Sequence, residues 1–271
     1  MTNINKSGKF ISRLLFVPRC ASCGIRLSPI AREDNLAYGL VCFCPDCMQK
    51  WQSAKQDMCH TCYMSAAKCT CTHINRKIKQ PFIPSLFFYR QNRSLVQNQA
   101  LFTAKCRHFP ELFEFLAKEL APSVERLLAE QKTDKSNCIL TWLPRGQKAL
   151  KKYGHDQAKK ICLELSRELG IPALPLLSRK GGKEQKKLDE RDRAKNSAQS
   201  IFLNDKLKGF DRKDLVSDAK IQDFIEGKTV IVVDDIITTG ASMRRAILLL
   251  EPLKPCSVLC ACVARCEIKS K

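Results

Sequence analysis

One short stretch near the C-terminal end carries residue types that could hold a phosphorylated sugar. An apolar β-branched run, Val230–Val233, is followed by two carboxylates and then by small hydroxyl residues and a glycine. Backbone N–H groups at a helix start, together with hydroxyls, form a cradle for an anion. Glycine lets the backbone approach a phosphate closely. The residues that we expect to contact the ligand here are Asp234, Asp235, Thr238, Thr239, Gly240, Ala241 and Ser242.

Each half of this pattern also occurs alone, as a buried strand with an acidic end or as a hydroxyl cap on a helix. A bare anion would be repelled by Asp234 and Asp235, but vicinal hydroxyls of a sugar could donate hydrogen bonds to them. A sugar phosphate satisfies both halves. The order of residues therefore favours a ribose 5-phosphate type of ligand.

A second chemical pattern lies near the N-terminus, where closely spaced cysteines form four pairs. The pairs are Cys20 and Cys23, Cys44 and Cys47, Cys59 and Cys62, and Cys69 and Cys71. Two thiolates on one tight turn can reach the same tetrahedral ion. Four pairs predict two Cys₄ sites and hence two structural Zn²⁺ ions in a tandem zinc ribbon.

The spacing leaves some features of these sites open. It does not decide whether the first two pairs share an ion or whether the pairs interleave. A reduced thiol cluster without metal and an iron–sulfur cluster are the alternatives, and the usual iron–sulfur spacing is missing. Cys42 belongs to no pair.

Strands and helices must position the phosphate loop, and hydrophobic periodicity indicates where they lie. Helical spacing of apolar residues covers 112–120, 158–169 and 243–250, and short apolar runs predict strands at 138–143, 229–233 and 257–263. Strands that alternate with helices predict an α/β fold with a mainly parallel sheet and helices on both faces. Residues 178–196 have no apolar face and are expected to form a long loop. We divide the chain into a double zinc ribbon (1–75), a linker (76–85) and an α/β domain (86–271).

Composition indicates where in the cell the protein is located and what kind of partner it binds. The formal net charge is +20, which favours an anionic partner, either nucleic acid or a phosphorylated metabolite. The excess is marked in Arg145–Lys195, although this stretch could also be an ordinary solvated face. No apolar run is long enough to span a membrane, and the N-terminal apolar stretch is too short for a secretory signal. We therefore expect a cytoplasmic protein that does not insert into membranes.

The phosphate loop resembles the signature of type I phosphoribosyltransferases, and nearly the whole chain resembles the ComF family. Members of that family combine a double zinc ribbon with a phosphoribosyltransferase domain. Further matches are Gln185-x-x-Leu188 with Arg193-x-x-Asn196, Lys105, and the turn Trp142-Leu-Pro144.

The resemblance implies a function as well as a fold. It implies binding of 5-phosphoribosyl 1-diphosphate (PRPP) or a ribonucleotide, with Mg²⁺ accompanying PRPP and a link to DNA uptake in natural competence. Asp234 and Asp235 would be the catalytic residues, and Pro144 and Arg193 would join the ligand site. Single-stranded DNA and a competence helicase are the implied macromolecular partners.

One departure from the family leaves two functions open. The family motif Arg-Gly-Phe-Asn-Gln is Tyr153-Gly154-His155-Asp156-Gln157 in this chain, so an arginine is lost and an amide has become an acid. The chain is then either a phosphoribosyltransferase with an unknown acceptor or a catalytically inactive nucleotide- and single-stranded-DNA-binding competence factor. Nothing in the sequence fixes the oligomeric state.

Overall fold

The computed structural model describes residues 19–27, 42–70, 78, 80–180, 199–204 and 221–266. Its helices are α3 (Pro45–Lys55), α5 (Val96–Cys106), α6 (Pro110–Glu130), α7 (Gln147–Tyr153), α8 (Gln157–Leu169), α10 (Ile221–Ile225) and α11 (Ala241–Leu250), with short 3-10 turns η1 (Lys135–Asn137) and η2 (Glu251–Leu253). Its strands are β1 (Phe87–Tyr89), β2 (Cys138–Trp142), β3 (Leu177–Arg179), β4 (Ile201–Leu203), β5 (Thr229–Ile237) and β6 (Ser257–Cys266). Within these ranges, no helix combines the length and apolar character needed to cross a membrane.

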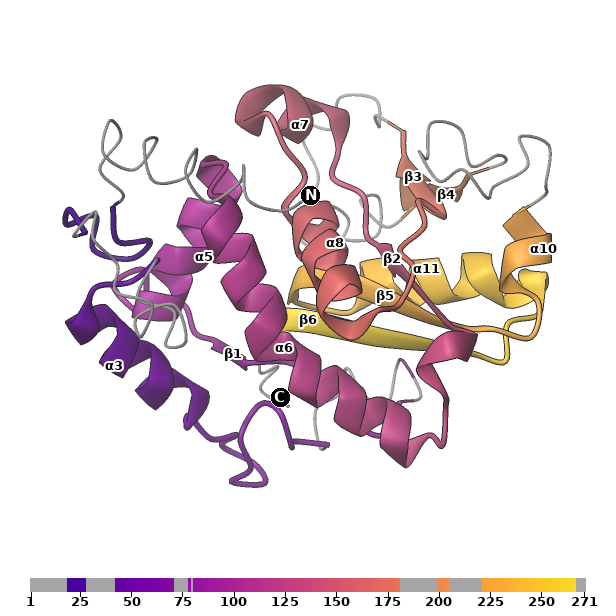
Figure 1. Ribbon diagram of the computed structural model, residues 1–271, viewed down its shortest axis with the longest axis horizontal. Helices are drawn as coiled ribbons and strands as arrows, with labels where there is room; N and C mark the ends of the chain where they lie inside the picture. The colour runs from indigo at the N-terminus through magenta and orange to yellow at the C-terminus, as the bar shows by residue number, and fades with distance from the viewer. Residues whose placement is uncertain are drawn as a thin grey trace, which may run out of the picture.

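A four-stranded parallel sheet forms the centre of the molecule, in the order β1-β6-β5-β2 (Figure 1). Parallel strands need crossover connections, which the intervening helices supply. The strands β3 and β4 form a separate antiparallel pair. Because all four strands of the main sheet run the same way, their C-terminal ends share one edge, where the ends of β2 and β5 meet.

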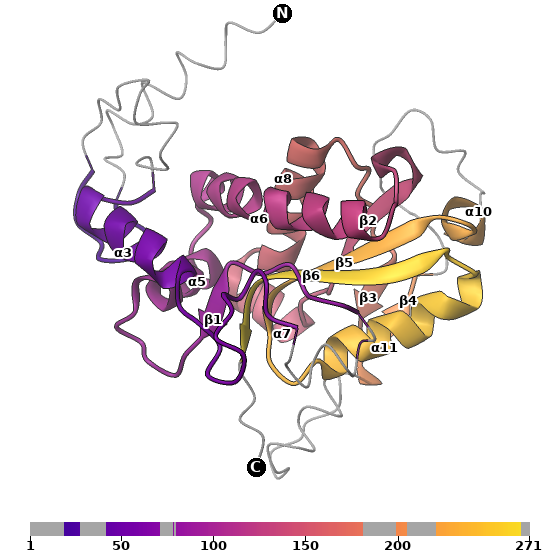
Figure 2. The same ribbon diagram turned by 90° about the horizontal axis from the view of Figure 1, so that it is seen from below.

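Helices cover both faces of this sheet (Figure 2). On one face, α6 and α8 pack against the side chains of Ile231 and Val233 in β5. On the other face, α11 packs against their neighbours Val230 and Val232. Burial on both faces explains why β5 is an uninterrupted apolar run. The predicted α/β fold with a parallel sheet flanked by helices is confirmed.

The strand before the phosphate loop is longer than the sequence pattern suggested. We expected it to end at Val233, but β5 continues through both aspartates to Ile237. The reason is its neighbour: β6 runs for ten residues and pairs with β5 as far as Ile237, opposite Arg265. The two carboxylates therefore project from a strand that is hydrogen-bonded on one side, which limits how far they can move.

The expected long loop at 178–196 also begins later than predicted. Ser178 and Arg179 belong to β3, where Arg179 pairs with Ile201 of β4. Residues 181–196 of this segment lie outside the described residues.

The cysteine-rich segment packs directly on the α/β domain. Trp51 of α3 is fully buried, and its ring lies 5.3 Å from that of Phe87 in β1. Its indole N–H donates to Glu119 of α6 at 3.1 Å, and Lys55 forms an ion pair with the same carboxylate at 2.6 Å. These contacts join the two parts in one continuous core.

The segment predicted as a linker lies along the edge of β6. The backbone N–H of Cys262 donates to the carbonyl oxygen of Pro84, and that of Leu86 donates to the carbonyl oxygen of Val263, both at 2.9 Å. The buried side chain of Gln80 accepts from the N–H of Cys260 at 2.7 Å and donates to its carbonyl oxygen at 2.9 Å. These bonds satisfy the strand edge that β1 is too short to cover. The exact domain boundaries stay predictions.

Candidate functional site

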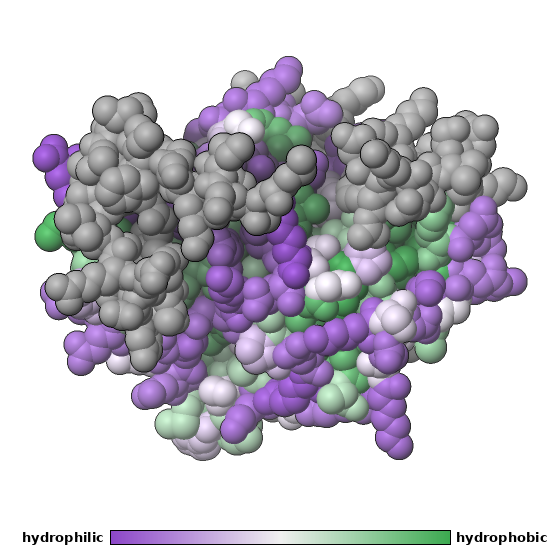
Figure 3. Space-filling model, viewed as in Figure 1, coloured by the Kyte–Doolittle hydropathy of each residue, from purple (hydrophilic) through white to green (hydrophobic). Residues whose placement is uncertain are grey.

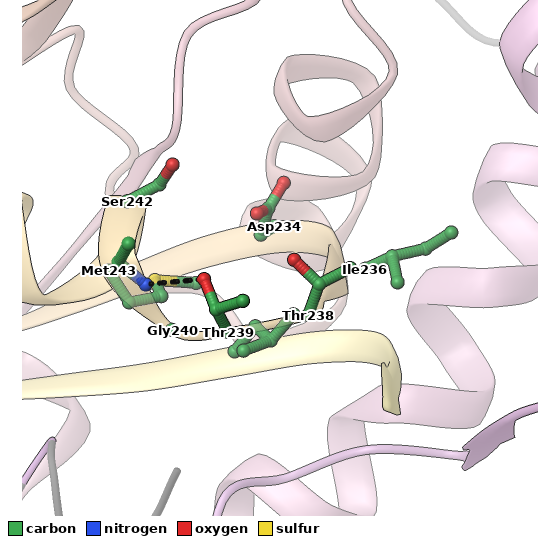
Figure 4. A pocket seen from close by; sticks show the side chains of 9 residues that line it. Asp234, Ile236, Thr238, Thr239, Gly240, Ser242 and Met243 are labelled. Atoms are coloured by element: carbon green, nitrogen blue, oxygen red, sulfur yellow. Dashed lines mark hydrogen bonds between the residues drawn. The ribbon is translucent and has the colours of Figure 1, made fainter. Parts of the chain in front are cut away.

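The predicted phosphate loop forms a pocket at the C-terminal end of β5 (Figure 4). Its lining combines all but one of the residues singled out in this loop, namely Asp234, Thr238, Thr239, Gly240, Ala241 and Ser242, with Ile236, Ile237 and Met243. Gly240 is the N-cap of α11 and has a φ of 73°. Side chains with a Cβ rarely adopt this conformation, so glycine is needed where the chain turns into the helix.

The N-terminus of α11 is well suited to an anion. Its N-cap, Gly240, makes no side-chain hydrogen bond to the helix, and the hydroxyl of Thr239 accepts only a long bond of 3.4 Å from the N–H of Ala241. The hydroxyls of Thr238 and Ser242 lie around the same loop in Figure 4. Free N–H groups at the positive end of the helix dipole attract negative charge. The loop is therefore a chemically consistent cradle for a phosphate.

The two aspartates that precede the loop occupy different positions. Oδ1 of Asp234 accepts a hydrogen bond of 2.9 Å from the N–H of Asp235. The carboxyl of Asp234 lines the pocket, whereas the half-buried Asp235 lies beyond the lining. Burial raises the pKa of Asp234 well above its ordinary value, and the neighbouring charge of Asp235 raises it further. A sugar hydroxyl that donates to this carboxylate would help to replace the lost solvation.

Two groups that lie far away in the sequence face these carboxylates. Arg179 of β3 interacts electrostatically with both Asp234 and Asp156, and its positive charge acts to lower the pKa of Asp234. Burial is the main reason that the pKa of Asp156 is raised, and the charge of Asp235 contributes to this. No sequence pattern indicated Arg179, because it ends a strand of only three residues at the start of a charged segment.

A group of basic residues surrounds Tyr153 at the same edge of the sheet. The guanidinium carbon of Arg145 lies 4.5 Å from the centre of the Tyr153 ring, and the ammonium groups of Lys152 and Lys105 lie at 5.1 Å and 5.9 Å. Nη1 of Arg145 donates to the carbonyl oxygen of His155 at 2.9 Å. An aromatic ring can hold several cations close together, and an anion there would relieve their mutual repulsion.

Other residues predicted for the ligand site are only partly covered by the structure. Pro144 lies just beyond β2, next to Leu143, whose N–H donates to the carbonyl oxygen of Val233 at 3.0 Å. It therefore follows the strand end that adjoins the phosphate loop. Arg193 and the matching segment Gln185–Asn196 lie outside the described residues.

The first cysteine cluster brings together Cys20, Cys23, Cys44 and Cys47, whose sulfur atoms all lie within 4.8 Å of one another. The sulfur atoms of Cys23 and Cys44 are 3.7 Å apart, and tetrahedral Zn–S bonds would separate two sulfurs by about 3.8 Å. The turn at Gly24, with φ of 76°, and the start of α3 at Pro45 hold the two pairs. The pairing that the sequence left open is thus first pair with second.

The second cluster contains Cys59, Cys62 and Cys69, again with sulfur atoms within 4.8 Å. The predicted fourth ligand, Cys71, lies outside the described residues. The N–H of Tyr63 donates to the carbonyl oxygen of Cys59 at 2.9 Å, the same turn that Gly24 makes with Cys20 in the first cluster. Both clusters could hold a metal ion, and three or four thiolates are the donors that Zn²⁺ prefers.

Cys42 belongs to neither cluster. It is buried in the core, with its sulfur 3.5 Å from the carbonyl oxygen of Glu111.

Comparison with known families identifies the C-terminal part of the chain. Residues 183–270 match the family model described as phosphoribosyl transferase domain. This range includes β5, the pocket loop, α11 and β6. The C-terminal half therefore carries a phosphoribosyltransferase domain, and the protein combines it with N-terminal cysteine clusters suited to metal.

Solved structures show weaker similarity. The chain is 15% identical to the allosteric regulatory enzyme of purine biosynthesis over 59% of its own length and 26% of that chain, with a TM-score of 0.32. It is 13% identical to a hypoxanthine phosphoribosyltransferase from Trypanosoma cruzi (59% and 71% of the two chains, TM-score 0.32). It is 11% identical to one from Staphylococcus aureus (63% and 76%, TM-score 0.33). No curated protein matches the chain. The family match, and not these distant similarities, carries the assignment.

Proposed function

We propose that the C-terminal domain binds PRPP or a ribose 5-phosphate nucleotide at the loop that joins β5 to α11. The observation that carries this proposal is the order of groups around one pocket: a half-buried carboxylate at Asp234, a left-handed glycine at Gly240, and the uncapped start of α11. In this arrangement Thr238–Ser242 hold the 5-phosphate, and Asp234 and Asp235 accept hydrogen bonds from the ribose hydroxyls.

The basic group around Tyr153 supports a ligand with a second phosphate centre. The family's motif arginine is absent from Tyr153–Gln157, but Arg145 and Lys152 place positive charge at the same edge of the sheet. We infer that this charge, together with Pro144 and Arg193, receives the pyrophosphate of PRPP. Mg²⁺ would arrive with PRPP and take most of its remaining ligands from PRPP and water.

In the catalytic form of the proposal, the domain transfers the phosphoribosyl group from PRPP to an acceptor. Pyrophosphate leaves the anomeric carbon with the bonding electron pair, and the acceptor supplies the electron pair of the new bond there and releases its proton to water. Asp234 and Asp235 act by fixing the ribose while positive charge stabilises the departing pyrophosphate. A chain that combines this domain with two zinc sites would resemble the ComF family, and on that resemblance we propose a role in DNA uptake.

A panel assay tests the catalytic form. Protein, PRPP and Mg²⁺ are combined with individual purine and pyrimidine bases, and released pyrophosphate is measured against Gly240→Val as the matched control. Release that depends on one base and disappears in the variant would establish a phosphoribosyltransferase. Binding of PRPP without base-dependent release would favour the inactive nucleotide-binding form.

The alternative is a binding protein for nucleotides and single-stranded DNA. The formal charge of +20 favours it, and on the face drawn in Figure 3 hydrophilic residues cover much of the coloured surface. Binding that rests on phosphate contacts releases counterions and therefore weakens steeply as salt increases. Anisotropy titrations of a labelled oligonucleotide at two salt concentrations decide the question. Binding that is absent at low salt, or independent of salt, would remove the nucleic-acid role.

A further inference from the structure

Arg265 is a buried charge whose position the phosphate site does not explain. The residue lies near the end of β6, is fully buried, and stands 5.2 Å above the ring of Phe88. Its Nη2 donates to the carbonyl oxygen of Ala66 at 2.7 Å and to that of Cys69 at 2.9 Å. Burying a guanidinium is costly unless hydrogen bonds and opposite charge compensate for the lost water. The carbonyl oxygens supply the first of these.

The second cysteine cluster can supply the opposite charge. Cys69 belongs to that cluster with Cys59 and Cys62. Metal-bound cysteines are deprotonated, so Zn²⁺ with three or four thiolates leaves the site with a net charge of about −1 to −2. The metal-loaded cluster is therefore a natural counter-charge for Arg265. Metal held by Cys59, Cys62 and Cys69 would also fix the turn whose carbonyl oxygens at Ala66 and Cys69 accept from Arg265.

The backbone of Arg265 connects this cluster to the phosphate loop. Arg265 pairs with Ile237 of β5 on one side and with Phe88 of β1 on the other. Ile237 lines the pocket and directly precedes Thr238, the first hydroxyl residue of the loop. One residue thus holds the metal cluster with its side chain and the start of the phosphate loop with its strand.

We propose that Arg265 is a positioning residue that makes ligand affinity at the phosphate loop depend on metal in the second cysteine cluster. The side chain of Arg265 donates to Ala66 and Cys69, and the end of β6 pairs with Ile237; metal in the second cluster would keep this arrangement fixed. When the metal leaves, this anchor loosens and the loop samples conformations that do not bind the phosphate. This inference rests on the proposed binding of a sugar phosphate at the loop.

A second arginine provides a matched control. Arg126 donates to the carbonyl oxygen of Ala67 in the same turn of the second cluster and stands 4.2 Å above the ring of Phe82. It lies on α6, whereas Arg265 lies on a strand that pairs with the loop strand. Replacement of Arg126 removes a similar contact to the cluster and leaves the β5–β6 pairing untouched.

The experiment compares Arg265→Met with Arg126→Met in the full metal-loaded chain. Calorimetry gives the affinity for PRPP, elemental analysis the zinc content, and circular dichroism the Tm. We expect Arg265→Met to bind PRPP about tenfold more weakly, an ordinary size for coupling between two sites, and Arg126→Met to bind within about twofold of the wild type. Chelation of the wild type should weaken PRPP binding and added Zn²⁺ should restore it, whereas zinc should have little effect in Arg265→Met.

Hydrogen exchange of a peptide covering residues 236–242 separates failure of this inference from failure of the proposed function. Faster exchange there in Arg265→Met and in chelated wild type, but not in Arg126→Met, supports the coupling even if PRPP does not bind. Equal exchange and equal affinity in both variants would overturn it.

If Arg265→Met does not fold, Arg265→Lys retains the charge with fewer fixed donors, and chelation of the wild type requires no variant. An unchanged loop in the chelated protein would then reject the proposal.

Discussion

The carboxylate of Asp156 accepts a hydrogen bond of 2.8 Å from the backbone N–H of Arg145, eleven residues earlier in the chain. Its other oxygen accepts from the N–H of Lys159 at 3.2 Å and caps α8. The carboxylate of Asp156 thus holds the turn after β2 against the start of α8. This turn carries Pro144 and Arg145, so Asp156 has a structural role whether or not the domain is catalytic.

Truncation of Asp156 should lower stability in a way that an amide partly prevents. Loss of an N-cap costs about 1 kcal/mol, with a range of roughly 0.5–2 kcal/mol. Asp156→Ala loses the cap and the bond to Arg145, and we expect its free energy of unfolding to fall by about this amount or more. Asp156→Asn should lose less, because asparagine caps helices as well as aspartate does. Urea denaturation of both variants measures the difference, and equal stability of Asp156→Ala and wild type would contradict this role.

Substitution of Gly240 should abolish binding of the sugar phosphate. Valine is strained at a φ of 73°, and its side chain would block close approach of the phosphate to the backbone.

Asp235→Asn should weaken binding more mildly, because an amide oxygen still accepts a hydrogen bond without the charge. Calorimetry with PRPP or a ribonucleoside monophosphate measures both effects. Unchanged affinity in Gly240→Val would place the ligand elsewhere, and equal affinity of the wild type for inorganic phosphate would remove the role of the aspartates.

Asp234→Asn should stabilise the fold at neutral pH while weakening ligand binding. The pKa of Asp234 is raised in the folded state, first by burial and then by the charge of Asp235. Between the ordinary carboxyl pKa of about 3.9 and the raised value, the folded state binds more protons than the unfolded state, so stability falls as the pH rises. The amide removes this penalty. Its advantage over wild type in urea denaturation should be small near pH 4 and grow towards neutral pH, and an advantage that does not change with pH would be inconsistent with a buried carboxyl.

Purified protein should contain two Zn²⁺ per chain, and their retention should depend on pH. Burial and neighbouring thiols raise the pKa of Cys47 to about 12 in the cluster without metal. Zinc must displace the thiol protons, so its affinity decreases as the pH falls. Elemental analysis after purification without added metal gives the stoichiometry, and transfer to a chelator at several pH values gives the trend. One zinc or none would reject the tandem arrangement, and a transfer rate independent of pH would argue against thiolate ligands.

The local chemistry of both sites was predictable from the sequence. The phosphate loop depends on Asp234, Thr238–Ser242 and the left-handed Gly240, all within nine consecutive residues. The pairs Cys20/Cys23 and Cys59/Cys62 likewise each sit on one short turn. Periodicity identified the segments that form β2, β5, β6, α6, α8 and α11, because each buries an apolar face whose spacing is a local property.

The tertiary structure decided which of these local elements meet. Asp156 at the start of α8 and Arg179 in β3 come close enough to the aspartates of β5 to interact electrostatically, and packing of the chain unites the first two cysteine pairs. The bond from Arg265 to Ala66 joins residues 199 positions apart. Residue types and spacing specify a turn, because its atoms are fixed by a few adjacent dihedral angles. Contacts across the sheet depend on how whole elements pack, and no short sequence pattern carries that information.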